Sequence, residues 1–250
     1  VQAIGMGEAL KYLSNIGMEN VYNYEKKLTS YALKKLQEIP NIKIYGVQTE
    51  LYPSMKLAVE GKEITCGGET LAEGIAVKKP GGVTLPVVDA LVDEILLVNE
   101  RELEWAVGAL IEQQRVVSEG AGAAGIAAIY ANPALFAGKK VGVVICGGNI
   151  DPRLLASILN RNMAVDGRIA RLRIDISDEP GMLAAISTTI GTCGGNIVEI
   201  YHQRLFYDVP AKLAKIDAVI ETRGPDHVDE IIAALRAAHF QVRQLDDSAS

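Results

Sequence analysis

The chain alternates between short apolar runs bounded by glycine or proline and longer segments in which apolar residues recur at helical spacing. Residues 141–146 form such a run, broken only by Gly142 and followed by two more glycines. This pattern predicts a buried strand that ends in a tight turn. The Asp-Pro pair at 151–152 then predicts the cap and first residue of a helix. Because open α/β sheets bind ligands at the carboxyl ends of their strands, Cys146 at this turn is a candidate binding residue.

The first 39 residues are predicted to form two helices, of which the first ends at Gly17. Residues 42–47 follow a Pro-Asn turn and predict a short strand. The second helix carries apolar residues on one side, at Val21, Tyr24, Leu28, Tyr31 or Ala32, and Leu36. This periodicity predicts a helix packed on a sheet, and it indicates no chemistry.

The middle of the chain is predicted to be α/β. Residues 92–98 read as a strand, and Asn99 with Glu102 has the spacing of a capping box, which predicts a helix to about residue 117. Residues 120–130 are rich in glycine and alanine and predict a closely packed helix. Their first glycines match the spacing of a dinucleotide-binding loop, but that loop needs a preceding strand and a later acidic residue, and both are missing. The glycines therefore indicate tight packing at a helix start.

A second pattern begins at residue 168. The predicted elements are a strand at 171–177, a helix within 178–195 capped by Asp178, strands at 196–205 and 214–222, a helix at 225–239 and a strand at 240–245. The order βαββαβ is that of a ferredoxin-like unit. The predicted fold class is α/β, an incomplete α/β domain followed by this unit, with segments 1–46, 47–167 and 168–250.

Composition narrows the classes of function. The 250 residues are 49% hydrophobic and 22% charged, which suits a chain with a sizeable core. A net charge of −6 without a basic block argues against nucleic acid as a partner. The three cysteines lie far apart, which favours a reducing cytoplasm, and the three histidines lack metal-ligand spacing. No apolar run is long enough to span a membrane, and a start without Met inside a helix predicts a fragment.

The first two segments each resemble a different protein family. Within residues 1–46, AIGMGEALKYLSNIGMENVYNYEKKLTSYALKKLQEIPNIKIYG resembles the cysteine desulfurases, without any of their catalytic motifs. From residue 47 on, GVQTELYPSMKLAVEG, GGETLAEGIAVKKPG, LVDEILLVNERELEWAV, VSEGAGAAGIAAIYANP and VGVVICGGNIDPRLLASILNR resemble, in order, the second half of the threonine dehydratases (threonine ammonia-lyases). The two resemblances meet near residues 45–47, which favours a fusion at that point.

The dehydratase resemblance implies pyridoxal 5′-phosphate (PLP) as cofactor and threonine or serine as substrate. It implies that Cys146 faces the pyridine nitrogen as a neutral partner, which favours β-elimination. It also implies that Glu119 lies near the cofactor ring and that the backbone of Gly74 approaches it. Judged from the residues alone, Cys146 could be an inert buried thiol, Glu119 a charge at a helix N-terminus and Gly74 a turn residue.

The same family needs a lysine for the Schiff base and a glycine-rich phosphate loop. By the resemblance, the lysine lies far upstream and the loop falls near residues 21–28, where VYNYEKKL contains no glycine. Lys26 and Lys27 lie on a predicted helix. We therefore expect this chain to be a C-terminal portion of a dehydratase. It keeps one side of the cofactor site and should be catalytically inactive by itself.

The segments DEPGML and GGNIVEI in the last unit resemble ACT domains, which bind amino acids and regulate metabolic enzymes. The resemblance implies an effector site at Asp178, Gly181 and Asn196, with isoleucine or valine as effector and a homo-oligomer formed through this unit. These three residues could instead be turn residues only. Two alternatives stay open, a non-catalytic amino-acid-binding regulatory protein and a fragment related to the cysteine desulfurases.

Overall fold

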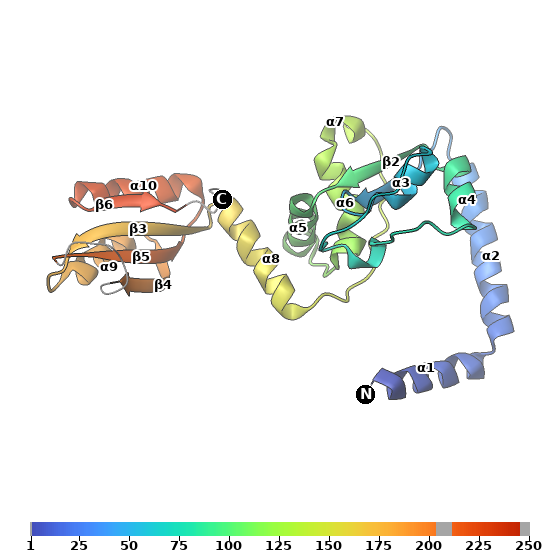
Figure 1. Cartoon of the computed structure of the whole chain (residues 1–250), viewed down its shortest axis with the longest axis horizontal. Helices are drawn as coiled ribbons and strands as arrows, with labels where there is room; N and C mark the ends of the chain where they lie inside the picture. The colour runs from blue at the N-terminus through green and yellow to red at the C-terminus, as the bar shows by residue number, and fades with distance from the viewer. Residues whose placement is uncertain (1, 204–211, 246–250) are drawn as a thin grey trace. The chain divides into compact units, whose positions relative to one another are not determined.

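The computed structural model describes residues 2–203 and 212–245 (Figure 1). The chain divides into two compact units, residues 1–46 with 81–95, and residues 47–80 with 96–250. The described helices and strands form a mixed α/β fold, which confirms the predicted class at that level.

The first unit begins with two helices, α1 (Gln2–Ile16) and α2 (Met18–Gln37). Gly17 between them has a φ of 84°, a conformation that glycine adopts without strain, and its N–H donates to the Leu13 carbonyl oxygen (3.0 Å). The predicted helix end at Gly17 is therefore confirmed. A further helix of this unit is α4 (Thr84–Leu91).

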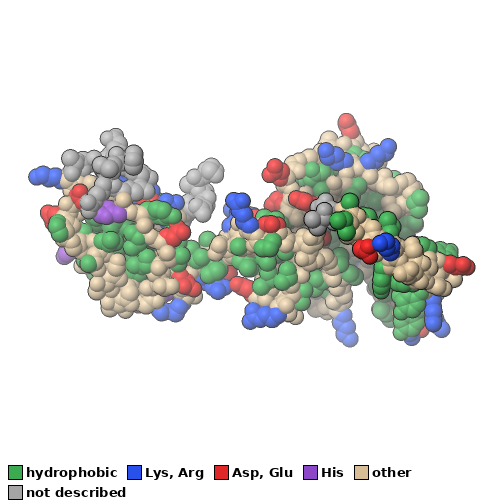
Figure 2. All heavy atoms as spheres, turned by 90° about the horizontal axis from the view of Figure 1, so that it is seen from below, with side chains coloured by type: hydrophobic (Ala, Val, Ile, Leu, Met, Phe, Trp, Pro, Cys, Tyr) green, Lys and Arg blue, Asp and Glu red, His purple; other side chains and the backbone are tan. Residues whose placement is uncertain are grey.

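The apolar side of α2 is open in the part of the chain that the structure describes. Tyr24, Leu28 and Tyr31 of the predicted apolar stripe are 62%, 48% and 63% exposed, so the prediction of a helix packed on a sheet is wrong. Apolar periodicity identifies the side of a helix that can be buried, but burial requires a second layer on that side. Figure 2 shows apolar side chains on the surface of the molecule.

Two short strands, β1 (Tyr45–Thr49) and β2 (Glu94–Val98), pair with each other. β1 begins later than the predicted range 42–47. Before it, the N–H of Ile44 donates to the carboxylate of Asp93 (2.7 Å), and the N–H of Asp93 donates to the carbonyl oxygen of Ile44 (2.9 Å). The Asp93 carboxylate thus accepts the hydrogen bond from Ile44 that a neighbouring strand would otherwise accept.

In the second unit, α5 (Glu100–Ala109) packs on α6 (Gly120–Ala131). The predicted capping box is confirmed, because the side chains of Asn99 and Glu102 each accept from the other's backbone N–H (3.0 and 2.8 Å). A π-helical turn (Leu110–Gln114) extends α5 and ends at Arg115, whose φ is 59°. Residues 0–4% exposed fill this region, namely Leu103, Ala106, Val107, Leu110, Ala123, Ala124, Ala127 and Ala128. Shorter helices are α3 (Ser54–Val59), η1 (Glu73–Ile75) and α7 (Pro133–Phe136).

Residues 139–151 have no regular secondary structure, so the predicted strand at 141–146 is wrong. Two backbone groups per residue need hydrogen-bond partners, and in a strand these come from a neighbouring strand. None of the described strands pairs with this segment. The sequence has the composition of a strand, but the described residues do not supply its neighbour.

The helix after this segment, α8 (Pro152–Val165), starts as predicted. The Asp151 carboxylate accepts from the N–H groups of Arg153 (2.9 Å) and Leu154 (3.0 Å), and Pro152 at the first position has no N–H to leave unpaired. The Asn162 side chain donates to the carbonyl oxygen of Glu104 (3.0 Å), which joins α8 to α5.

The C-terminal part of this unit is a four-stranded antiparallel sheet with two helices. In chain order its elements are β3 (Ile169–Ser177), α9 (Met182–Thr192), β4 (Asn196–Gln203), β5 (Leu213–Glu221), α10 (Pro225–Ala237) and β6 (Gln241–Gln244). The strands lie in the order β4-β5-β3-β6. The chain order agrees with the prediction, whose residues 204 and 205 lie outside the described residues.

Alternate residues of the central strands form the core of this part, because a strand turns successive side chains to opposite faces. The core contains Ala170, Leu172, Ile174, Ile176, Ala214, Ile216, Ala218 and Ile220, together with Ile186 and Ile190 of α9 and Val228, Ile231 and Leu235 of α10. The remaining side chains of β3 and β5 lie on the face turned away from the helices.

Across the described ranges, no helix has both the length and the apolar character to cross a membrane. No group of three His, Cys, Asp or Glu side chains among the same residues could hold a metal ion.

Candidate functional site

The N-terminus of α6 is the centre of the candidate site. Glu119 is its N-cap residue, and Gly120 and Gly122 follow in the first turn. A Cβ on Gly120 would overlap the backbone of Leu71, and a Cβ on Gly122 would overlap the carbonyl oxygen of Cys146. Glycine alone permits these approaches, so the packed helix start predicted from the glycine pattern is confirmed.

Cys146 lies on a turn that is held against this helix start. The Glu119 N–H donates to the carbonyl oxygen of Gly147 (2.9 Å), and the buried Ser118 hydroxyl lies 3.3 Å from the carbonyl oxygen of Cys146. Gly147 has a φ of 70°, and a Cβ there would overlap the Glu119 carboxylate. Cys146 is exposed with a free thiol, so it is not an inert buried cysteine.

Gly74, in the short helix η1, approaches the same helix start. A Cβ on Gly74 would lie 3.0 Å from the Cβ of Ala121 and 3.4 Å from Oε1 of Glu119. The structure therefore brings together the three residues that the sequence predicted for the cofactor, Cys146, Glu119 and Gly74.

Glu100 is a polar residue that sequence reasoning missed. Its carboxylate accepts from the Thr70 hydroxyl (2.6 Å) and from the N–H of Leu71 (2.7 Å), and so holds the loop that leads to Gly74. In the sequence, Glu100 is one of several acidic residues in the first turn of a helix, a common position that favours the helix dipole. Its partners are distant along the chain, so no local pattern indicates them.

This arrangement fits one side of a PLP ring. A thiol is a neutral hydrogen-bonding group, a carboxylate is an acceptor, and Gly74 and Gly147 are exposed, so a flat ring can approach the backbone there. Residues 21–28, where the resemblance places the phosphate loop, lie inside α2, and Lys26 and Lys27 are exposed on that helix. That segment therefore does not provide a phosphate loop.

The predicted effector residues do not meet within one copy of the chain. Asp178 and Gly181 follow the C-terminal end of β3. Asn196 begins β4 and pairs with Glu221, which in turn pairs with Ile169 at the N-terminal end of β3. Because β3 has nine residues, its ends are about 26 Å apart, much longer than an amino acid. One small ligand cannot contact Gly181 and Asn196 of the same copy.

The start of α9 also differs from the prediction. The helix begins at Met182 after Gly181, whose φ is 95°, and no described side chain caps it. Asp178 is therefore not the cap, and its N–H donates to the carbonyl oxygen of Lys212 (3.0 Å). The helix thus starts later than a cap at Asp178 would place it, because Gly181 in the left-handed conformation turns the chain into the helix.

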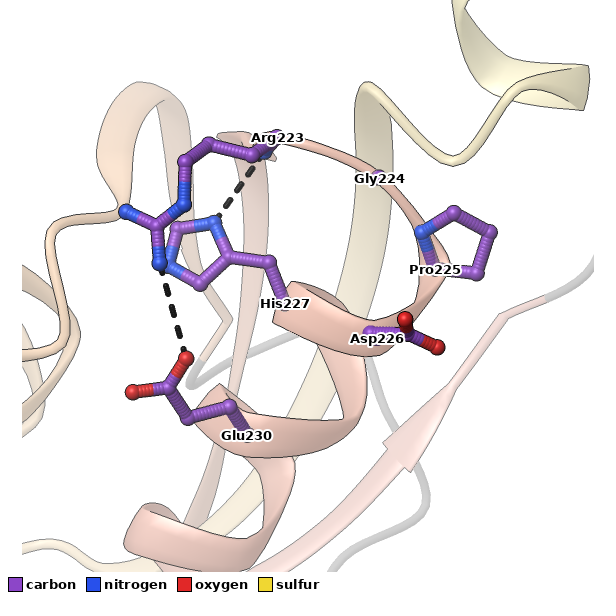
Figure 3. A pocket seen from close by; sticks show the side chains of 6 residues that line it. All are labelled: Arg223, Gly224, Pro225, Asp226, His227 and Glu230. Carbon is purple, nitrogen blue, oxygen red and sulfur yellow. Dashed lines mark hydrogen bonds and ion pairs between the residues drawn. The ribbon is translucent and has the colours of Figure 1, made fainter.

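A pocket at the start of α10 is lined by Arg223, Gly224, Pro225, Asp226, His227 and Glu230 (Figure 3). Nδ1 of the buried His227 accepts from the N–H of Arg223 (3.1 Å), so Nε2 carries the proton and donates to the Cys193 carbonyl oxygen (2.8 Å). The Arg223 guanidinium lies 3.5 Å from the Glu230 carboxylate. These contacts join α10 to the end of α9, which indicates a structural role.

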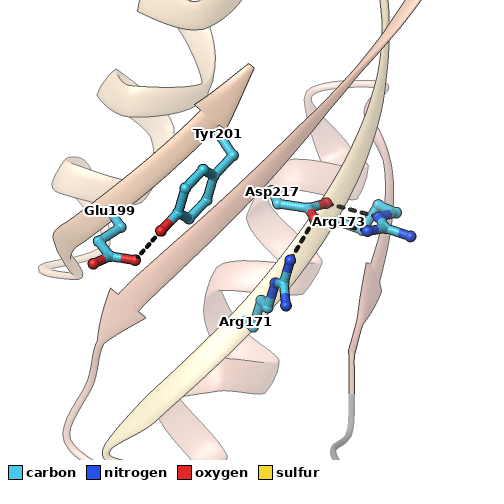
Figure 4. A network of polar contacts seen from close by, with 5 residues as sticks. All are labelled: Arg171, Arg173, Glu199, Tyr201 and Asp217. Atoms are coloured by element: carbon cyan, nitrogen blue, oxygen red, sulfur yellow. Dashed lines mark hydrogen bonds and ion pairs between the residues drawn. The ribbon is translucent and has the colours of Figure 1, made fainter. Parts of the chain in front are cut away.

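A buried carboxylate lies on the face of the C-terminal sheet that is turned away from α9 and α10 (Figure 4). Asp217 accepts two hydrogen bonds from Arg173 (both 2.7 Å) and one from Arg171 (2.9 Å), and its side chain is 0% exposed. The hydrogen bonds from Arg173 hold the pKa of Asp217 below its ordinary value, against the opposing effect of burial. Nearby, Tyr201 donates to Glu199 (2.7 Å), and this bond raises the pKa of Tyr201.

Known proteins resemble the chain over most of its length. A family model described as pyridoxal-phosphate dependent enzyme matches residues 29–147. The L-threonine ammonia-lyase of Thermotoga maritima is 41% identical over 216 residues, 86% of this chain and 53% of that protein. That of Geobacter sulfurreducens is 36% identical over 205 residues, 81% of this chain and 51% of that protein. A solved structure of processed threonine deaminase isoform 2 from Solanum lycopersicum is 29% identical with a TM-score of 0.44, covering 50% of this chain and 35% of that one.

These matches confirm the resemblance to the threonine dehydratases, whose family is PLP-dependent. The chain spans about half the length of the curated relatives it matches. The family match begins at residue 29, inside the segment 1–46, whose resemblance to the cysteine desulfurases stays a prediction. Residues 29–147 therefore match the model of the pyridoxal-phosphate dependent enzymes, and the chain is similar over most of its length to L-threonine ammonia-lyases.

Proposed function

We propose that residues 47–147 hold one side of PLP in an ammonia-lyase that acts on threonine or serine, and that residues 168–250 are a ferredoxin-like ACT regulatory domain. The observation that carries the catalytic part is the meeting of Cys146, Glu119 and Gly74 at the start of α6. Similarity to L-threonine ammonia-lyases supports the choice of reaction. Because the chain spans about half of those relatives, the activity belongs to a completed catalytic domain.

PLP, when bound, supplies the electron sink for β-elimination from a hydroxy amino acid. The residues of this chain would orient it. The thiol of Cys146 would face the ring nitrogen as a neutral partner, and so would leave that nitrogen less basic than a carboxylate would. Glu119 would lie beside the ring, and Gly74 would let the backbone approach its edge.

We further propose that the chain by itself does not deaminate threonine. The dehydratase-like motifs in this sequence include neither the Schiff-base lysine nor the phosphate loop. Without the lysine, the cofactor has no covalent anchor and no group that exchanges with the substrate amine.

A hybrid enzyme tests the catalytic proposal. Residues 47–147 replace the matching part of the Thermotoga maritima ammonia-lyase, and 2-oxobutanoate from threonine and pyruvate from serine are measured. We expect the hybrid to bind PLP and to form at least one of the two products. A folded hybrid that binds PLP and forms neither product would contradict the proposal, provided that the unmodified enzyme is active under the same conditions.

The ACT assignment is supported by the order of the elements and by the separate core of residues 170–242. We infer that it binds isoleucine or valine, because threonine deamination opens isoleucine synthesis and a product is a fitting inhibitor. Since Gly181 and Asn196 lie at opposite ends of the sheet, a ligand that touches both must lie between two copies. Calorimetric titration of the chain with isoleucine, valine and threonine, together with light scattering, tests this. Binding by a monomer, or unchanged binding after Asn196→Ala, would contradict the shared site.

The second candidate is a non-catalytic amino-acid-binding protein. It is favoured by the contrast between the closed core of residues 170–242 and the unpaired segment 141–145. Amino-acid binding by the chain, combined with an inactive hybrid enzyme, would select it. For either candidate we propose a cytoplasmic location, since the three cysteines are free.

A further inference from the structure

Residues 141–145 carry backbone groups without partners. Within the described residues, no N–H or C=O of this segment makes a hydrogen bond. Four of the five residues are valine or isoleucine, which are typical of strands. A run of unpaired polar backbone between apolar side chains is a template for pairing with another strand.

The segment is also asymmetric. On one side it contacts α6, since a Cβ on Gly125 would lie 2.6 Å from Cγ1 of Val143. The next residue, Val144, is 84% exposed, and Val141 and Ile145 are 43% and 40% exposed. The segment therefore contacts a helix through Val143, whereas no described strand pairs with its backbone.

We propose that residues 141–146 are a docking site for a β-strand of the complementary part of the PLP-dependent domain, a polypeptide that carries the Schiff-base lysine and the phosphate loop. This inference rests on the proposed function. The Thermotoga maritima relative is covered to 53% of its length, so it contains a large portion that this chain does not match. That portion is the occupant that the chemistry requires, because the candidate site has residues for one side of the cofactor only.

Strand pairing along residues 141–145 would affect the candidate cofactor site directly. The unpaired segment leads into Cys146, which is fixed at its carbonyl oxygen by Ser118 and at the next residue by Glu119. A strand bound along residues 141–145 would fix the other end of the turn. The same docking step would thus assemble the cofactor site and orient the thiol.

The test uses the full chain, co-expressed with the tagged portion of the Thermotoga maritima enzyme that the match leaves out. Co-purification and affinity are measured, and that enzyme's own two portions serve as the positive control. We expect the chain to bind the tagged portion. If the control portions associate and this chain does not, the docking proposal is overturned.

A proline variant locates the contact. Val144→Pro removes an N–H and blocks strand pairing without touching the contact of Val143 with α6, so we expect affinity to fall by about tenfold or more. Val83→Pro is the matched control, because Val83 is also 84% exposed and lies next to a helix start. Val144→Lys, which keeps the N–H and places a charge in the new interface, should also weaken binding. Equal affinity of the wild-type chain and both Val144 variants, each with an unchanged circular dichroism spectrum, would overturn the proposal.

Two other outcomes separate the competing explanations. Self-association of the chain that Val144→Pro abolishes, without binding of the tagged portion, would assign the segment to a second copy and overturn the proposal. Specific binding without threonine turnover would support docking while it contradicts the proposed reaction. The hybrid enzyme tests that reaction independently.

Discussion

The backbone N–H of Glu119 donates a hydrogen bond of 2.9 Å to the carbonyl oxygen of Gly147 and joins the start of α6 to the turn after Cys146. The turn keeps this position although the segment before it lacks strand pairing. The position of this turn depends on the close approach of its backbone to Gly122, because a side chain at Gly122 would overlap the carbonyl oxygen of Cys146.

Gly122→Ala should therefore destabilise the α5–α6 region by about 1–3 kcal/mol, the usual cost of overpacking. Gly125→Ala is the control in the same helix, since its Cβ would meet only a methyl group of Val143, which can move. Urea unfolding followed by the fluorescence of Trp105, which stacks on Tyr130 in this region, measures both. Equal stability of the two variants would contradict the assigned contact.

Asp217→Asn should destabilise the C-terminal sheet by about 3 kcal/mol, because it leaves Arg173 and Arg171 without a buried carboxylate partner. Asp175→Asn is the control, on the same sheet face but exposed, and should change stability by less than about 0.5 kcal/mol. Thermal unfolding followed by circular dichroism measures both variants. A small effect at Asp217 would show that the ion pair does not stabilise the sheet.

The same carboxylate predicts a pH dependence. The pKa of Asp217 is lowered in the folded chain, so its stabilising effect is complete above the unfolded value of about 3.9 and is lost as the pH falls below it. As the pH falls below about 4, the free energy of unfolding of the wild-type chain should decrease more than that of the Asp217→Asn variant. Parallel stability curves for the two proteins in that range would disprove the linkage.

Glu100→Gln should loosen the loop before Gly74, because the charged acceptor of the Thr70 and Leu71 bonds is lost. Hydrogen bonds to charged groups contribute about 1.5–3 kcal/mol, so a loss of about 1–2 kcal/mol is expected when an amide oxygen remains. Glu69→Gln, at an exposed neighbour, should have no measurable effect. Trp105 fluorescence during urea unfolding again provides the measurement.

The full chain mixed with PLP and threonine should form no 2-oxobutanoate. We propose this because the dehydratase-like motifs of the chain do not include the Schiff-base lysine. The unmodified Thermotoga maritima enzyme is the positive control. Turnover that is abolished by changing one lysine of this chain would show that the chain contains its own catalytic lysine.

In the hybrid enzyme, Cys146→Asp should lower threonine turnover by at least about tenfold, because a carboxylate would hold the ring nitrogen protonated. Cys146→Ser should have a mild effect, since a hydroxyl is also a neutral partner. The absorbance of bound PLP and kcat are measured for both variants, with Cys66→Ser as the control for loss of a thiol. Equal activity of the Asp and Ser variants would show that Cys146 does not face the ring.

The sequence alone determined the features that depend on neighbours along the chain. The capping box at Asn99 and Glu102, the cap at Asp151 and the helix end at Gly17 all follow from local hydrogen bonding and backbone conformation. The same holds for the order of elements from β3 to β6, because alternation and helical spacing are also local.

Tertiary structure decided whatever needs a partner from elsewhere. Residues 141–146 have the composition of a strand, yet no described strand completes their hydrogen bonds. The apolar side of α2 has the right spacing, yet no layer covers it in the described structure. The resemblance assigns Asn196 and Gly181 to one effector site, yet the register of β3, β4 and β5 places them at opposite ends of a sheet. Glu119, Gly74 and Cys146 meet because glycine lets distant backbone segments approach, and that approach depends on the fold.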